Sequence, residues 1–274
     1  MKIRKENQTE LAQYYRRSGW WYKHFWDIGG LHHGIFEGKT SNHRQAVENQ
    51  YRLVIDAGKI RQSMRVLDIG CGVGDGACYI AKHTGAKIVG ISIVPEQVKS
   101  GIKLSMLENL SNLVTFKVMN FQHTDFPPDY FDVVYGIESV SHSPDKHQLL
   151  KEMSRILKSG GKLIVSDGYL IRKPENMKEN ACLKNLLDGW HMYELIHIDT
   201  MLKHLKSNNL IITLKKDYIT AITNSINKMK ILVMIGSIFP INQAVRDNVR
   251  GMKGWVAGVG DRLFGYYLFV AQKK

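Results

Sequence analysis

The sequence predicts an α/β fold built on a mostly parallel sheet, and three observations lead to it. Between residues 65 and 167, apolar runs typical of strands alternate with segments of helical periodicity. A glycine-rich turn follows the first of these runs. The chain has 274 residues, 44% of them hydrophobic, which is enough for one large apolar core.

The alternating elements follow one another in βαβ order. Each strand is a short apolar run, and each helix begins near a capping or proline signal. Since strand and helix alternate, the strands should be parallel neighbours in one sheet. The expected strands are 65–69, 87–92, 113–118, 131–136 and 160–167, and the expected helices are 75–83, 95–109 and 146–157.

Segments on both sides of this unit belong to no βαβ repeat. Residues 8–26 and 43–58 have helical periodicity and are expected to lie across the rim of the sheet. Downstream, 199–206 is expected to be a helix, and 210–219 and 264–272 are expected to be the last two strands.

Some forty residues, 220–261, separate those last two strands. They are apolar, with helical periodicity and one interruption at Pro240. An insertion of this length is rarely an idle loop. We therefore expect a helical lid over the carboxyl ends of the strands, where open α/β sheets bind their ligands.

Charge and cysteine content narrow the binding partners and the cellular compartment expected for the protein. The net charge of +13 suits nucleic acid, an anionic membrane surface or a small anionic substrate, but the basic residues are scattered, as on a solvated surface. The three cysteines form no metal-binding or disulfide pattern, which fits a reducing cytoplasm and predicts no metal. The N-terminus lacks the apolar core of a signal peptide, and the apolar stretch 231–241 is too short to span a bilayer. A soluble protein is expected, with peripheral membrane contact left open.

The stretch VLDIGCGVGDG, residues 66–76, predicts a ligand turn. Gly70 and Gly72 after a strand allow the backbone to approach a ligand closely, and Cys71 between them fills little space. Glycine spacing alone does not exclude a dinucleotide. Asp68, two residues before Gly70, is placed to order a turn that receives a cationic amino-acid ligand.

Three motifs in order resemble the class I S-adenosylmethionine-dependent methyltransferases. DIGCGVG is typical of their first motif, NFQHTDFPPDYFD (120–132) resembles the segment before their fourth strand, and ILKSGGKLIVSD resembles their fifth strand. The resemblance covers about residues 40–170. It implies a Rossmann-like seven-stranded methyltransferase sheet, mostly parallel with an antiparallel last strand, with N-terminal helices and the inserted lid. The implied cofactor is S-adenosyl-L-methionine, with S-adenosyl-L-homocysteine as product.

The second strand, VGISIVPEQV, resembles the branch of sterol C-methyltransferases and tocopherol methyltransferases. In that branch a hydroxyl residue and a glutamine can hold the ribose, which implies this role for Ser92 and Gln97, with Ile93 beside them. The missing acidic residue weighs against NAD. By position Asn120 receives the adenine amino group and Phe121 stacks on the ring. A turn-forming Asn and a core Phe are the structural alternatives.

The segment 14–38 is rich in aromatic residues and resembles the N-terminal region of the same branch. By that resemblance His32 and His33 approach the methionine carboxylate or the sulfonium of the cofactor. The aromatic rings suit a nearby cation, although Phe25 and Trp26 serve equally well as packing residues.

The segment after the fourth strand is the expected reaction centre. The resemblance places Ile137 and Glu138 beside the cofactor. Glu138 is a candidate for general base, for orienting acceptor or for hydrogen-bond partner of the N-terminal segment. His142 is a candidate for proton transfer, but capping of the next helix or contact with adenine is also open. His191 follows the fifth strand, where relatives line the acceptor pocket, and is a further catalytic candidate with a structural alternative.

These features predict methyl transfer to a hydrophobic small molecule bearing an isoprenoid or sterol skeleton, with carbon favoured as acceptor atom. Transfer to oxygen or nitrogen of another natural product is the alternative, and a nucleic-acid methyltransferase or an inactive cofactor-binding protein ranks below it. An anionic group on the acceptor is left open, because Arg172 and Lys173 are candidates to meet a diphosphate, although a solvated loop is the more ordinary interpretation of this segment. No nucleic-acid partner is expected, and the oligomeric state is open. One domain is expected, with a helical cap (1–60), a cofactor-binding core (61–170) and an acceptor region (171–274).

Overall fold

In the computed structural model, described here for residues 8–21, 32–238 and 243–274, seven strands form one sheet in the order β3-β2-β1-β4-β5-β7-β6. All neighbouring pairs are parallel except those of β7, which runs antiparallel to β5 and to β6. The predicted fold class is confirmed, including the antiparallel last strand. The strands are β1 (Arg65–Ile69), β2 (Lys87–Ser92), β3 (Val114–Val118), β4 (Phe131–Ile137), β5 (Leu157–Leu170), β6 (Leu210–Asp217) and β7 (Phe264–Lys273).

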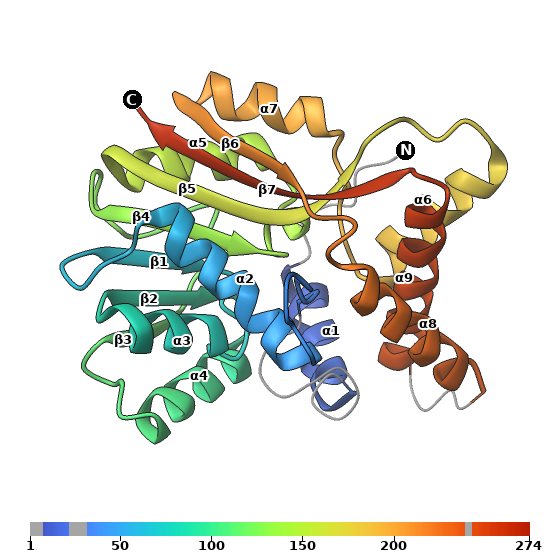
Figure 1. Cartoon of the computed structure of the whole chain (residues 1–274), viewed down its shortest axis with the longest axis horizontal. Helices are drawn as coiled ribbons and strands as arrows, with labels where there is room; N and C mark the ends of the chain where they lie inside the picture. The colour runs from blue at the N-terminus through green and yellow to red at the C-terminus, as the bar shows by residue number, and fades with distance from the viewer. Residues whose placement is uncertain (1–7, 22–31, 239–242) are drawn as a thin grey trace.

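Helices cover both faces of this sheet (Figure 1). Side chains of β1 alternate between the two faces: Val66 packs with Tyr51 and Ile80 in one apolar cluster, and Leu67 packs with Leu149 and Leu205 in the other. The sheet is therefore buried on both sides, as a parallel sheet requires. The helices are α1 (Gln8–Trp21), α2 (His43–Gly58), α3 (Asp75–Thr84), α4 (Pro95–Leu107), α5 (Lys146–Ile156), α6 (Met177–Gly189), α7 (Ile198–Ser207), α8 (Thr223–Ile238) and α9 (Gln243–Gly260).

The insertion between β6 and β7 consists of helices α8 and α9, which stand with α6 beside one end of the sheet (lower right in Figure 1). This agrees with the predicted helical insertion, although Pro240 lies outside the described residues. Residues 22–26 of the predicted first helix also lie outside them. The division into cap, core and acceptor region stays a prediction.

Helix α6 was not predicted from the sequence, yet the sequence contains a signal for it. The Asn176 side chain accepts a hydrogen bond of 2.9 Å from the Glu179 backbone N–H, and Asn-x-x-Glu is a common start of a helix. Among the described residues, no helix is both long and apolar enough to cross a membrane.

Candidate active site

The glycine turn joins β1 to α3 and leaves open space on one side. Gly70 (φ +79°) lies so close to β4 that a Cβ there would come within 2.5 Å of the Ser139 Cβ. Gly72 (φ +52°) also adopts the left-handed backbone, but a Cβ there would meet no protein atom within 4 Å. Because Gly72 lines a cavity, this free space is where a ligand can touch the backbone.

Asp68 lies behind this turn and does not line the cavity. The Tyr135 hydroxyl donates a hydrogen bond of 2.7 Å to its Oδ2, which ties β1 to β4. Burial raises the pKa of Asp68 to about 7, although the Tyr135 hydrogen bond acts in the opposite direction. Asp68 therefore supports the strand that carries the turn.

Polar groups at the ends of β2 and β3 are arranged around the same cavity. The Ser92 hydroxyl donates to Gln97 Oε1 at 2.7 Å and accepts from the Val94 backbone N–H. The Asn120 Oδ1 accepts from the Gln122 backbone N–H at 2.9 Å. An amide oxygen has two lone pairs, so this contact leaves Asn120 able to accept a second hydrogen bond.

Glu138 directly follows β4, and its side chain is hydrogen-bonded to the N-terminal segment. Its Oε1 accepts three hydrogen bonds: from the His33 backbone N–H (2.8 Å), from His33 Nδ1 (3.0 Å) and from the Tyr266 hydroxyl (2.7 Å). Burial raises the pKa of Glu138, but the charge and hydrogen bond of His33 and the Tyr266 hydroxyl outweigh it and lower the pKa to about 2. An ionised carboxylate with these partners orients the N-terminal segment and is a weak base.

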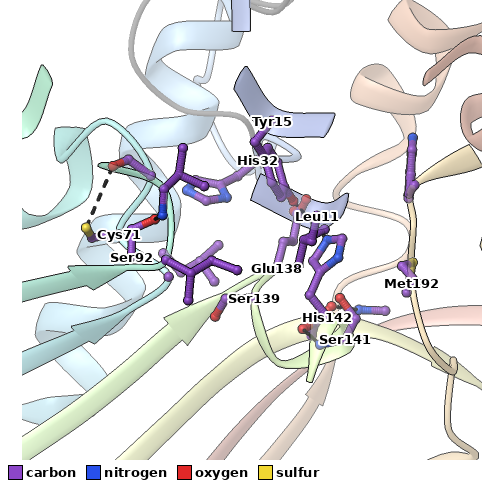
Figure 2. Close-up of a pocket in the computed structure, with 18 of the residues that line it drawn as sticks. Leu11, Tyr15, His32, Cys71, Ser92, Glu138, Ser139, Ser141, His142 and Met192 are labelled. Carbon is purple, nitrogen blue, oxygen red and sulfur yellow. Dashed lines mark hydrogen bonds between the residues drawn. The ribbon is translucent and has the colours of Figure 1, made fainter. Parts of the chain in front are cut away.

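His142 lies on the short turn after β4, and Figure 2 shows it beside Glu138 and Tyr15. The Tyr15 hydroxyl is 2.9 Å from its Nε2. Its Nδ1 is buried, with no hydrogen-bond partner among the described residues. Burial and the nearby Lys146 charge lower the pKa of His142 to about 4, so the imidazole is neutral at physiological pH.

The buried Lys146 is a residue of the site that the sequence analysis did not identify. Its Nζ donates to the backbone carbonyls of Ser141 (3.1 Å), Ser143 (2.7 Å) and Glu194 (2.9 Å). A cation in the first turn of a helix opposes the helix dipole, so the position itself predicts no lysine. These three acceptors hold the turn that bears His142 against the segment after α6.

The far part of the cavity is an apolar chamber. Asp167 on β5 lines it, accepts a hydrogen bond from the Ser141 backbone N–H at 2.9 Å, and has its pKa raised by burial to about 6. The remaining chamber residues are aromatic or aliphatic and come from α1, α6, α8, α9 and the segment after α6. They are Leu11, Tyr14, Leu186, Trp190, Met192, Leu195, Met229, Met252 and Trp255.

The structure brings together nearly all the site residues predicted from the sequence. Asp68 and His191 are the exceptions: the His191 Nε2 lies 3.5 Å from Asp247 Oδ2, and its ring packs on Tyr14. Arg172 does not line the cavity either, because Glu179 holds its guanidinium by two hydrogen bonds. Phe25 and Trp26 lie outside the described residues. The predicted residues that line the cavity are His32, His33, Gly70, Cys71, Gly72, Ser92, Ile93, Gln97, Asn120, Phe121, Ile137, Glu138 and His142.

Comparison with known proteins shows similarity to methyltransferases. Residues 67–165 match the family model of a methyltransferase domain. The chain is 29% identical over 202 residues to a chloroplastic tocopherol O-methyltransferase of Arabidopsis thaliana, and 31% identical over 180 residues to a sterol 24-C-methyltransferase of Aspergillus fumigatus. The matched segment and these relatives support a class I S-adenosylmethionine-dependent methyltransferase in the branch of the tocopherol and sterol methyltransferases.

These matches cover 66% and 64% of this chain, but only 58% and 47% of the two relatives. The chain thus spans about half the length of the curated relatives it matches. Among solved structures, the geranyl diphosphate C-methyltransferase of Streptomyces coelicolor has the same fold, with a TM-score of 0.76, 18% identity and full coverage of both chains. The family resemblance and the predicted fold are confirmed.

The residues of the site fit S-adenosylmethionine. The free space beside Gly72 admits a ligand against the backbone, and the Ser92–Gln97 pair and Asn120 offer hydrogen-bonding groups for a ribose and a base. No group of three potential metal ligands occurs within the described part of the chain.

Proposed function

We propose that this protein transfers a methyl group from S-adenosylmethionine to a hydrophobic small molecule bearing an isoprenoid or sterol skeleton. One observation carries the proposal: a single cavity is lined both by the Gly70–Gly72 turn and by the Trp–Met chamber. Bound S-adenosylmethionine supplies an electrophilic methyl group, and an apolar acceptor in the adjoining chamber lies within its reach. Proximity of this kind supplies much of the rate enhancement in methyl transfer.

In this proposal the cofactor lies across the carboxyl ends of β1, β2 and β3. The amino-acid end rests on Gly70 and Gly72, and the ribose binds to the Ser92 hydroxyl and the Gln97 amide, which a hydrogen bond holds side by side. The adenine is held by Asn120 and Phe121. His32 and His33 close the site from the N-terminal side, where Glu138 fixes His33.

The charges of the chamber favour an uncharged acceptor. Glu138 is ionised and Asp167 is a second carboxyl group on the wall, so a diphosphate or carboxylate in the chamber would be repelled. Arg172, which the sequence offered as a diphosphate ligand, is paired with Glu179 instead. Tocopherols and sterols, named in the relatives, are uncharged molecules with large apolar skeletons.

His142 is the proposed proton acceptor. Methyl transfer to carbon leaves a proton to be removed, and transfer to a hydroxyl oxygen requires the loss of that hydroxyl's proton. A neutral imidazole whose Nδ1 has no described partner can take the proton in either case. Carbon stays the favoured acceptor atom and oxygen the alternative. Both atoms are kept because the relatives include a C-methyltransferase and an O-methyltransferase.

The first test is calorimetric titration with S-adenosylhomocysteine, followed by a radiolabelled methyl-transfer screen over sterols, prenylated phenols, prenyl diphosphates and tRNA. We expect binding, and transfer to an uncharged organic-soluble acceptor whose product spectrum gives the methylated atom. Failure to bind the product, or transfer only to tRNA, would overturn the proposal.

A substitution tests the role of His142. In His142→Asn we expect kcat to fall by about 10²–10⁴-fold while the affinity for S-adenosylhomocysteine changes little, because the imidazole acts on the acceptor. The pH profile of wild-type kcat should be flat from neutral pH downward and fall as the imidazole is protonated near pH 4. Unchanged kcat in the variant would remove His142 from catalysis.

A further inference from the structure

Helix α8 has two apolar faces, and only one of them is used by the chamber. Met229 lines the cavity and Leu232 is buried in the core. On the opposite side Ile231, Met234 and Ile235 are 55%, 61% and 37% exposed. Their spacing of three and four residues places them together on one stripe of the helix. Three exposed large side chains in one stripe are a contiguous apolar patch, which has a cost in water.

The charge around this patch is positive. Residues 223–260, which form α8, α9 and their connection, contain five Lys or Arg residues and a single Asp. Lys230, next to Ile231, is exposed, and the sequence of α8 contains no acidic residue. Exposed apolar side chains beside basic residues favour contact with the interface of an anionic membrane, because the apolar groups leave water and the cations meet the anionic headgroups.

We propose that the outer face of α8 docks on an anionic phospholipid bilayer. Ile231, Met234 and Ile235 insert among the lipid chains, and the exposed Lys230 beside them contacts the headgroups. This inference rests on the proposed function, because an acceptor with an isoprenoid or sterol skeleton partitions into membranes. One helix then joins the two phases: its outer face contacts lipid, and Met229 on its inner face lines the acceptor chamber.

The charge also decides between a bilayer and a second copy of the chain. Two copies joined through this patch would bring two sets of basic residues together, which like-charge repulsion opposes. An anionic surface instead complements both the stripe and the charges.

The test is co-sedimentation with vesicles of phosphatidylcholine alone or mixed with phosphatidylglycerol. We expect the full chain to bind the mixed vesicles at least about tenfold more tightly, with salt weakening the binding. The triple variant Ile231→Ser, Met234→Ser, Ile235→Ser should lose at least about tenfold of this affinity. The matched control is Met106→Ser, Leu107→Ser on α4, where the side chains are 63% and 71% exposed and far from α8 in Figure 1. Its vesicle binding should equal that of the wild type.

Equal vesicle binding by the patch variant and the wild type, or equal loss in the α4 control, would overturn the docking proposal. Concentration-dependent dimerisation that the patch variant abolishes, without vesicle binding, would also overturn it in favour of self-association. Binding of S-adenosylhomocysteine and transfer to a detergent-solubilised acceptor are measured in parallel, and the patch variant should retain both. Vesicle binding without any methyl transfer would count against the proposed function and leave the docking surface supported.

Discussion

At the residue scale, Gly72 provides a direct test of the cofactor site. In Gly72→Ala the new Cβ enters the free space of the cavity, so we expect at least about tenfold weaker binding of S-adenosylhomocysteine by calorimetry. Gly38→Ala is the control, because Gly38 has a similar φ of +56° and also no atom within 4 Å, but it lies on the surface. Both variants should lose about 1 kcal/mol of stability from the left-handed backbone. Equal affinity in the two variants would argue against a ligand at Gly72.

The lowered pKa of Glu138 predicts that its carboxylate contributes to the loss of folding stability in acid. Its pKa is lowered from 4.5 to about 2 in the fold, so its ionised form stabilises the protein fully above pH 4.5, and this contribution is lost as the pH falls towards 2. At about 1.4 kcal/mol for each pKa unit, the contribution is about 3 kcal/mol. In Glu138→Gln the loss of unfolding free energy relative to wild type should therefore be largest above pH 5 and shrink towards pH 2. Denaturant unfolding at a series of pH values measures it, and a difference independent of pH would contradict the assignment.

The sequence predicted the residues that line the cavity better than it predicted the partners that hold them. Gly70, Ser92 and Asn120 fall within motifs whose order and spacing are local signals. Tyr266, which donates to Glu138, lies 128 residues away on β7, and only the sheet order brings it near. The sequence alone left three roles open for Glu138: general base, orienting acceptor, or hydrogen-bond partner of the N-terminal segment. Only the structure shows the three donors that surround its carboxylate and favour the last of these roles.

At the scale of elements, the regular βαβ core was predictable because each strand is an apolar run bounded by turn signals. The irregular parts were harder. Helix α6 begins after a loop of charged residues that suggested a solvated segment, although Asn176 caps it. Its last residues approach α9 so closely that a Cβ on Gly189 would lie 2.1 Å from the Gly251 backbone nitrogen, a contact that sequence periodicity does not reveal.

Lys146 joins two elements of the site, and its removal should affect both. Lys146→Met leaves the carbonyls of Ser141, Ser143 and Glu194 without this donor, so we expect the unfolding free energy to fall by about 2 kcal/mol. Since the turn bearing His142 would shift, kcat should fall by about tenfold or more, with S-adenosylhomocysteine affinity unchanged. Lys162→Met is the control, because Lys162 also donates to a backbone carbonyl, but that carbonyl belongs to Ala57 on α2 and not to the turn that bears His142. A loss of stability with unchanged kcat would leave Lys146 a purely structural residue.

At the scale of the whole molecule, the acceptor chamber is covered by the two flanking parts of the chain. Helix α1 comes from the N-terminal side, and α8 and α9 come from the insertion before the last strand (Figure 1). The central sheet thus carries the proposed cofactor site, while segments far apart in sequence line the proposed acceptor chamber. This division explains why the sequence predicted the cofactor itself but only the class of the acceptor, whose pocket has no local motif.

Helix α1 is joined to α9 by a buried hydrogen bond of 2.9 Å, which the Asn248 Nδ2 donates to the Tyr14 hydroxyl. In Tyr14→Phe this bond is lost, so we expect about 1 kcal/mol lower stability and a looser chamber. The KM for the acceptor should rise several-fold while S-adenosylhomocysteine affinity stays unchanged, because the cofactor residues lie on the sheet. Tyr79→Phe removes a hydroxyl that accepts from Arg52 on the surface and should leave KM unaltered. Two outcomes would contradict the idea that α1 closes the chamber against α9. One is an equal rise of the acceptor KM in both variants, and the other is weaker binding of S-adenosylhomocysteine by Tyr14→Phe.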